Sequence, residues 1–82
     1  MTQIKKLIQK FLDHPASLRY PQIEKVLDAL GFVKIKVRVG SHEKFKHPLL
    51  ERDLVFPIHN NDCDPFYKEM TAKIIKKNKM YL

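Results

Sequence analysis

The sequence predicts an α+β domain in which helices cover one face of a three-stranded antiparallel sheet. Two observations support this prediction. Residues 33–39 alternate between apolar and basic side chains, as a half-buried strand does, and residues 4–12, 23–30 and 66–75 place apolar side chains at helical spacing. The predicted order of elements is α-α-β-β-β-α, with the second face of the sheet left open.

The size and charge of the chain limit the classes of function. Its 82 residues suit one domain with a single modest core, and its formal net charge of +7 implies an anionic partner. Nucleic acid and an acidic protein fit better than a membrane surface, because some of the cations lie on a strand. We expect no membrane association, since no apolar run approaches the ~20 residues that a span needs. The single Cys63 fits a reducing compartment, which predicts a cytoplasmic protein.

Two helices are predicted before the first strand. Thr2 can cap the first helix, which ends near residues 13–15 and has an apolar stripe formed by Ile4, Leu7, Ile8, Phe11 and Leu12. Pro21 lies in the first turn of the second helix, and Gly31 is expected to end it in the left-handed backbone conformation. The buried stripe of this second helix is Ile23, Val26, Leu27 and Leu30.

A β-hairpin is predicted over residues 33–47. A three-residue loop, Gly40-Ser41-His42, would set Val37 opposite Phe45 and so bury Phe45 with the valines. In this register the apolar side of the first strand is Val33, Ile35, Val37 and Val39. The open face then carries five cations, with His42 at its rim: Lys34, Lys36, Arg38, Lys44 and Lys46.

The last strand and the last helix follow the hairpin. The strand is predicted over residues 53–58, with Leu54, Phe56 and Ile58 toward the core, and Pro57 marks an edge strand or its end. Asp64 is a good N-cap, with Pro65 at the first helical position. The inward residues of this helix are expected to be Phe66, Met70, Ile74 and Ile75.

The four histidines do not predict a metal site. His42 and His47 lie an odd number of residues apart along a strand and therefore point to opposite faces, and Cys63 has no partner cysteine. We expect neither a metal nor a small-molecule cofactor. His14 is interpreted as a last-turn residue of the first helix, His47 as a structural histidine on the core side, and His59 as a residue that orders the following loop.

His42 is therefore the candidate proton-transfer residue. It lies beside a glycine that allows close approach of a ligand and a serine whose hydroxyl suits a phosphate. A basic strand face is often only solvated, but the adjacent histidine favours a site for a polyanion. The candidate residues that contact this polyanion are Lys34, Lys36, Arg38, Gly40, Ser41, Lys44 and Lys46.

The same residues resemble a known family. Gly40-Ser41-His42, Phe45-Lys46-His47-Pro48, Pro57-Ile58-His59 and Ile74-Ile75-Lys76 together are similar to motifs of the HicA family of toxin mRNA interferases. The resemblance covers roughly residues 23–77. Within one domain over residues 1–82, it implies a core at residues 21–79 and an additional N-terminal helix at residues 1–15.

The resemblance implies a fold similar to the double-stranded RNA-binding domain. It also implies a metal-independent endoribonuclease that cleaves mRNA, and an acidic HicB-type antitoxin as its partner. We expect single-stranded message as the substrate, although the similarity of fold alone would favour a duplex. The catalytic histidine of the motif falls on His42. Many members have a histidine at the fourth motif position, where this chain has Glu43, so chemistry that belongs to that position would be lost here.

Two other functions remain open from the sequence. The first is a non-catalytic RNA-binding module on the same fold. The second is a small basic adaptor that binds an acidic protein.

Overall fold

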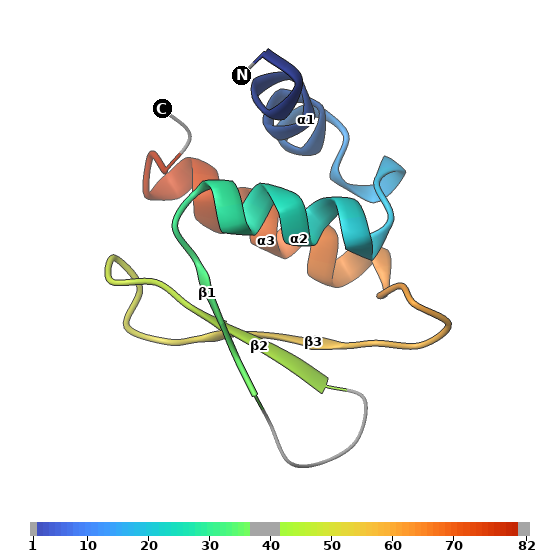
Figure 1. Cartoon of the computed structure of the whole chain (residues 1–82), viewed down its shortest axis with the longest axis vertical. Helices are drawn as coiled ribbons and strands as arrows, with labels where there is room; N and C mark the ends of the chain where they lie inside the picture. The colour runs from blue at the N-terminus through green and yellow to red at the C-terminus, as the bar shows by residue number, and fades with distance from the viewer. Residues whose placement is uncertain (1, 37–41, 81–82) are drawn as a thin grey trace.

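The structure is a computed structural model that describes residues 2–36 and 42–80, and it confirms the predicted fold class and element order (Figure 1). Three strands form an antiparallel sheet in the order β1-β2-β3. The elements are α1 (Thr2–Asp13), a short 3₁₀ helix (Pro15–Ser17), α2 (Tyr20–Ala29), β1 (Val33–Ile35), β2 (His42–Lys46), β3 (Leu54–Pro57) and α3 (Pro65–Lys77).

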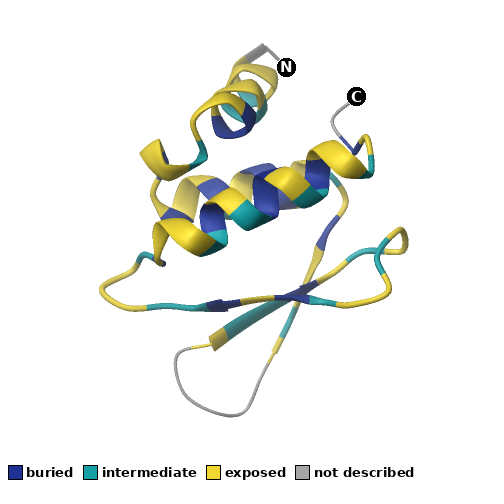
Figure 2. Ribbon diagram, turned by 180° about the vertical axis from the view of Figure 1, so that it is seen from behind, coloured by how far each residue is buried: buried dark blue, intermediate teal, exposed yellow. Residues whose placement is uncertain are grey.

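The helices lie on one side of the sheet. α2 and α3 cover one sheet face, and α1 lies on the far side of these two helices (Figure 1). Buried residues gather where the layers meet (Figure 2). The largest fully buried side chains are Phe11, Phe56, Leu18, Ile23, Leu27 and Ile75, which come from every layer. No described helix covers the opposite sheet face, which agrees with the predicted open face (Figure 1).

The helix ends follow the local sequence signals. α1 ends at Asp13, and α2 is followed by Gly31 with φ of +93°, which confirms the predicted left-handed residue. Gly31 N–H donates to the Asp28 carbonyl, and Phe32 N–H donates to the Leu27 carbonyl at 2.9 Å, the pair of bonds of a Schellman motif. This end of α2 fixes the point at which the chain enters β1.

The predicted register of the hairpin is wrong. β1 pairs with β2 so that Lys34 lies opposite Phe45 and Ile35 opposite Lys44. Directly opposed residues share a face, so Lys34 points to the helices with Phe45, whereas Val33 is 63% exposed on the open face. Phe32, one residue before β1, is buried, so Lys34, two positions later, points to the same side of the sheet. Residues 37–41, including Val37 and Val39, lie outside the described residues.

The last strand and the last helix are partly as predicted. β3 is an edge strand that ends at Pro57, and Leu54 and Phe56 are buried. The Asp64 carboxylate accepts a hydrogen bond from Phe66 N–H at 3.1 Å, which confirms the N-cap. Phe66 itself, expected inside, is 62% exposed, and the buried stripe of α3 is Lys68, Thr71, Ala72 and Ile75.

Candidate functional site

The open face of the sheet presents His42 to solvent. His42 is the first residue of β2 and pairs with Pro57 of β3, so the expectation that it lies in the hairpin loop is wrong. Its side chain is exposed. The pairing of the three strands defines the members of this open face as Val33, Ile35, His42, Lys44, Lys46, Val55 and Pro57.

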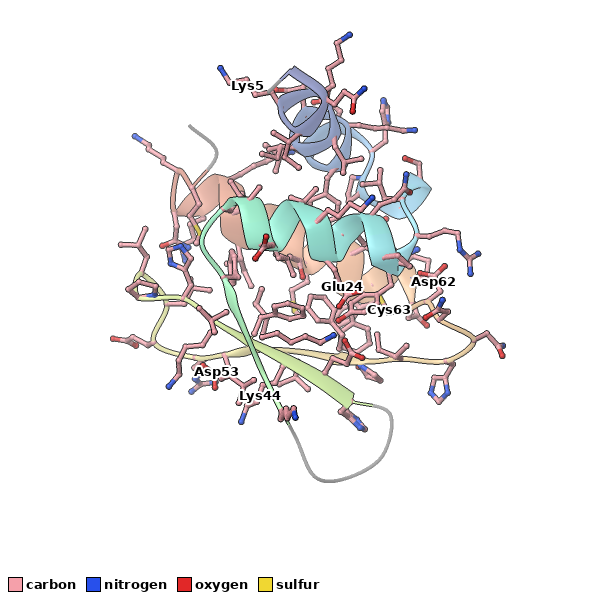
Figure 3. The ribbon with its side chains drawn as sticks, viewed as in Figure 1. Lys5, Glu24, Lys44, Asp53, Asp62 and Cys63 are labelled. Carbon is pink, nitrogen blue, oxygen red and sulfur yellow. The ribbon has the colours of Figure 1, made fainter. Side chains whose placement is uncertain are left out.

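Lys44 and Lys46 are the cations that β2 contributes to the open face, as predicted. The ammonium group of Lys44 lies 3.7 Å from the carboxylate of Asp53, and both side chains are partly exposed (Figure 3). Lys46 is exposed at the end of β2. The neighbouring Val33 and Val55 are 63% and 40% exposed, so the open face is apolar as well as basic.

Lys34 does not belong to the open face, and its predicted location is wrong. Its ammonium group lies 2.7 Å from Glu24 of α2 and 2.8 Å from Glu43 of β2. These two hydrogen bonds raise the pKa of Lys34. The inward position is tolerated because the ammonium group pairs with two carboxylates and about half of the side chain remains in contact with solvent.

Among the other predicted binding residues, only Lys36 lies within the described part of the chain. Lys36 follows β1 and is exposed. Arg38, Gly40 and Ser41 lie outside the described residues, so their predicted contacts with RNA stay predictions.

Glu43 follows His42 directly and points to the helix side of the sheet. Its carboxylate accepts a 2.6 Å hydrogen bond from the hydroxyl of Tyr20, the first residue of α2, and the 2.8 Å bond from Lys34. Burial alone would raise the pKa of Glu43, but the bonds from Lys34 and Tyr20 outweigh it and lower the pKa. Burial and the bond to Glu43 raise the pKa of the Tyr20 hydroxyl. Glu43 therefore ties β2 to α2.

Asp62 forms a second polar cluster at the start of α2. One carboxylate oxygen accepts hydrogen bonds from Tyr20 N–H at 3.0 Å and Cys63 N–H at 2.9 Å, and lies 3.1 Å from the buried Lys68 ammonium group. Burial would raise the pKa of Asp62, but these hydrogen bonds lower it. Tyr20 thus contacts Asp62 through its backbone and Glu43 through its side chain. Neither cluster was predicted, because partners 23 and 42 residues apart leave no local pattern.

Two of the other histidines have roles in the fold. Leu49 N–H donates to Nδ1 of His47 at 3.1 Å, and Nε2 of His47 donates to the Leu30 carbonyl at 3.0 Å, so the predicted structural role is confirmed. The backbone of His59 pairs with Asp62 in both directions, while its side chain is exposed. The loop after β3 is therefore ordered by the main chain of His59.

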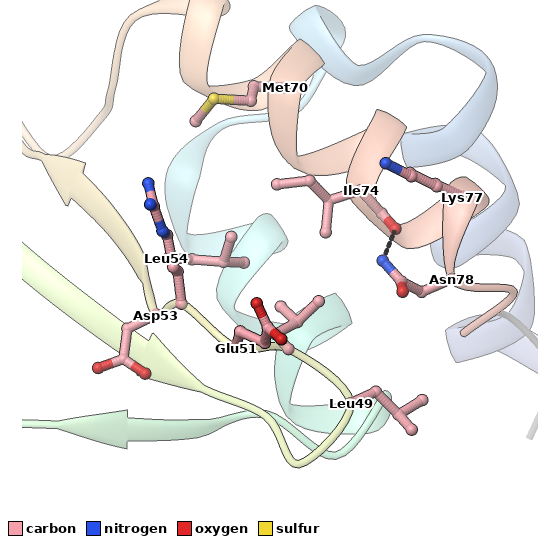
Figure 4. Close-up of a pocket in the computed structure, with 10 residues that line it drawn as sticks. Leu49, Glu51, Asp53, Leu54, Met70, Ile74, Lys77 and Asn78 are labelled. Carbon is pink, nitrogen blue, oxygen red and sulfur yellow. Dashed lines mark hydrogen bonds between the residues drawn. The ribbon is translucent and has the colours of Figure 1, made fainter.

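Metal-ligand clusters and pockets add no second candidate site. Within residues 2–36 and 42–80, no three histidine, cysteine or carboxylate side chains come together as a metal site. Cys63 is buried, and burial raises the pKa of its thiol. An open groove of about 560 Å³ lies between the β2–β3 loop and α3, where Leu49, Leu54 and Ile74 meet charged residues at its rim (Figure 4).

One comparison with known protein families places the chain among toxins of bacterial toxin–antitoxin systems. A family model described as "HicA toxin of bacterial toxin-antitoxin" matches residues 20–77, and the chain belongs to this family. Membership implies an antitoxin partner. Comparisons with curated proteins and with solved structures found no match. In the described part of the chain, no helix has the length and apolar character to cross a membrane.

Proposed function

We propose that this chain is a metal-independent endoribonuclease that cleaves single-stranded mRNA in the cytoplasm, with His42 as its proton-transfer residue. The observation that carries the proposal is the exposure of His42 at the start of β2, on the open face of a HicA-family domain. An imidazole takes and gives protons near neutral pH and contributes typically ~10²–10⁴-fold to a rate.

The proposed reaction uses the ribose 2′-hydroxyl as nucleophile. The 2′ oxygen bonds to the adjacent phosphorus while the bond from phosphorus to the 5′ oxygen breaks. Nε2 or Nδ1 of His42 accepts the 2′ proton, and water supplies a proton to the departing 5′ oxygen. The products are a 2′,3′-cyclic phosphate and a 5′-hydroxyl. DNA is spared because it lacks the nucleophile.

Lys44 is the proposed partner of His42 in this step. Both residues belong to β2 and share its open face, two positions apart. The ammonium group of Lys44 would stabilise the charge that develops on the phosphoryl oxygens, at the cost of its weak, partly exposed contact with Asp53. Lys46, at the exposed end of the strand, would contact a neighbouring phosphate.

The proposed antitoxin is an acidic protein of the HicB type that covers the open face. A stable protein interface needs an apolar centre and a complementary charged rim. Val33 and Val55 provide exposed apolar surface, and Lys44 and Lys46 provide the positive charge. Such a partner would cover His42 and block access of RNA.

The proposal is tested by inducing the chain in cells and by incubating purified protein with a single-stranded RNA. We expect growth arrest and cleavage products that end in a cyclic phosphate, and no cleavage at a site whose ribose is 2′-deoxy. His42→Ala should abolish both effects, whereas His59→Ala, which alters another exposed histidine, should retain them. Cleavage that persists in His42→Ala would overturn the assignment of the catalytic residue.

One observation favours a non-catalytic RNA-binding module as the second candidate. Glu43 occupies the fourth position of the family motif and is held by Tyr20 and Lys34 on the helix side, so it adds no second proton-transfer group beside His42. RNA binding without cleavage by the unmutated chain would select this module.

A further inference from the structure

The net charge of the chain is concentrated on two helices and not on the sheet. α1 carries three lysines and one aspartate, and residues 65–79 carry five lysines and one glutamate. The rest of the chain carries eight basic and seven acidic residues. The two helical segments therefore account for six of the seven net positive charges.

Most of these lysines are exposed, and we call the exposed ones together the helical lysine surface. Each is exposed, and none forms an ion pair with another described residue. α1 contacts α3, and Figures 1 and 2 show α3 in the layer next to α1. Lys5 projects outward from α1 (Figure 3). The members of this surface are Lys5, Lys6, Lys10, Lys73, Lys76, Lys77 and Lys79.

The end of α3 is held firmly on the core. Lys79 has φ of +52°, its N–H donates to the Lys76 carbonyl at 3.1 Å, and the next residue, Met80, is buried. Asn78 caps the helix through a 2.9 Å bond to the Ile74 carbonyl. Lysines near a helix C-terminus are also favoured by the helix dipole, which accounts for Lys10 but not for Lys5 and Lys6 near the start of α1.

We propose that the helical lysine surface binds the sugar-phosphate backbone of RNA, separately from the open face of the sheet. Phosphate contacts need several exposed cations and no apolar centre. None of the large apolar side chains exposed in the described part of the chain belongs to α1 or to the last turns of α3, which disfavours a protein partner.

The packing of α1 disfavours a membrane surface as the ligand. An amphipathic helix binds lipid by inserting its apolar face, but the apolar face of α1 is part of the core, with Phe11 and Leu12 buried. The inference goes beyond the proposed function, because it concerns binding through a different surface and holds for a chain that cannot cleave RNA.

The test measures binding of a fluorescent single-stranded oligoribonucleotide to full-length protein that carries His42→Ala, so that the RNA stays intact. Three double variants each remove two positive charges: Lys6→Gln with Lys10→Gln on α1, Lys73→Gln with Lys76→Gln on α3, and the control Lys25→Gln with Arg52→Gln at exposed sites elsewhere. Kd is measured over a range of salt concentrations, with the same variants tested on DNA of equal length.

We expect both helical variants to raise Kd about tenfold and to reduce the salt slope by roughly 0.7 for each lysine that contacts a phosphate. The control pair should change neither quantity, and DNA should bind within a few-fold of RNA, since the backbone is the ligand. An unchanged salt slope in both helical variants would overturn the inference. So would loss of binding to the antitoxin, or to vesicles of anionic phospholipid, with RNA binding intact.

Discussion

The hydroxyl of Tyr20 donates a 2.6 Å hydrogen bond to the carboxylate of Glu43, and this bond joins the start of α2 to the residue that follows His42. Tyr20 is buried, and its backbone N–H is bound to Asp62. One residue therefore anchors both the strand that presents the candidate catalytic histidine and the loop that leads into α3.

Removal of this hydroxyl should destabilise the fold. We expect Tyr20→Phe to lower the free energy of unfolding by about 1–2 kcal/mol, because the ring still packs on Phe56 while Glu43 loses a charge-assisted bond. For a chain of this size, that corresponds to a drop of roughly 5–10 °C in Tm. Thermal and urea unfolding measure the change. Tyr67→Phe is the control, since none of the described hydrogen bonds uses the Tyr67 hydroxyl, and an equal loss in both variants would contradict the role of Tyr20.

Stability should fall in acid. The pKa values of Asp62 and Glu43 are lowered in the folded chain from ordinary values of 3.8 and 4.5. Their contribution to the free energy of unfolding is therefore complete above these ordinary values and is lost as the pH falls through the lower folded-state values. Urea unfolding between pH 2 and 6 checks this expectation. Asp62→Asn should weaken the dependence of the free energy of unfolding on pH in acid. Asp28→Asn, at an exposed position on α2, should leave this dependence unchanged.

Gly31 should not tolerate a side chain. Its φ of +93° is a conformation that L residues rarely adopt, and an added Cβ would lie 3.4 Å from Nε2 of His47. We expect Gly31→Ala to cost about 1–3 kcal/mol through backbone strain. Ala29→Gly, two residues earlier at an exposed position, should cost at most about 1 kcal/mol. A Gly31→Ala chain as stable as the original would contradict this account.

The His59 side chain should contribute little to folding. The sequence suggested that this histidine orders the loop after β3, but the structure assigns that role to backbone bonds of 2.8 and 3.0 Å with Asp62. We expect His59→Ala to change the free energy of unfolding by less than about 0.5 kcal/mol. Asn61→Val should lower the free energy of unfolding by more than His59→Ala does, because Asn61 has φ of +63°, a conformation that β-branched residues rarely adopt. Melting curves of the two variants give the comparison.

The periodic parts of the chain could be predicted from sequence, because a single pattern decides them. Spacing of apolar residues located the helices, and Asp64 and Gly31 marked two of their ends. The pattern could not show which side of β1 faces the helices, because alternation indicates only that the two sides of a strand differ. Val33 was predicted to face the core, but Lys34 points to the helix side because its ammonium group pairs with the carboxylates of Glu24 and Glu43.

The candidate site was predicted less completely than the fold. His42 was selected because it follows Gly40 and Ser41 in an expected loop, whereas it is the first residue of β2. Lys44 was expected on the open face because only local parity along the strand decides this, and it lies there. The contacts of Glu43 and the burial of Lys68 depend on residues brought together from distant positions, and no local pattern reports them. The strong total charge is a property of composition, and its concentration on α1 and α3 follows from residue counts once the helices are placed. Only the structure shows which lysines form ion pairs.

Phe11, fully buried in the core, belongs to α1, and Leu18, equally buried, follows the 3₁₀ helix; both precede the first residue matched by the family model. A chain shortened to the matched residues would lack these two side chains and expose the apolar surfaces of α2 and α3 that they now cover. For expression, crystallisation or display of this toxin, the smallest useful unit therefore begins at the first helix and not at residue 20.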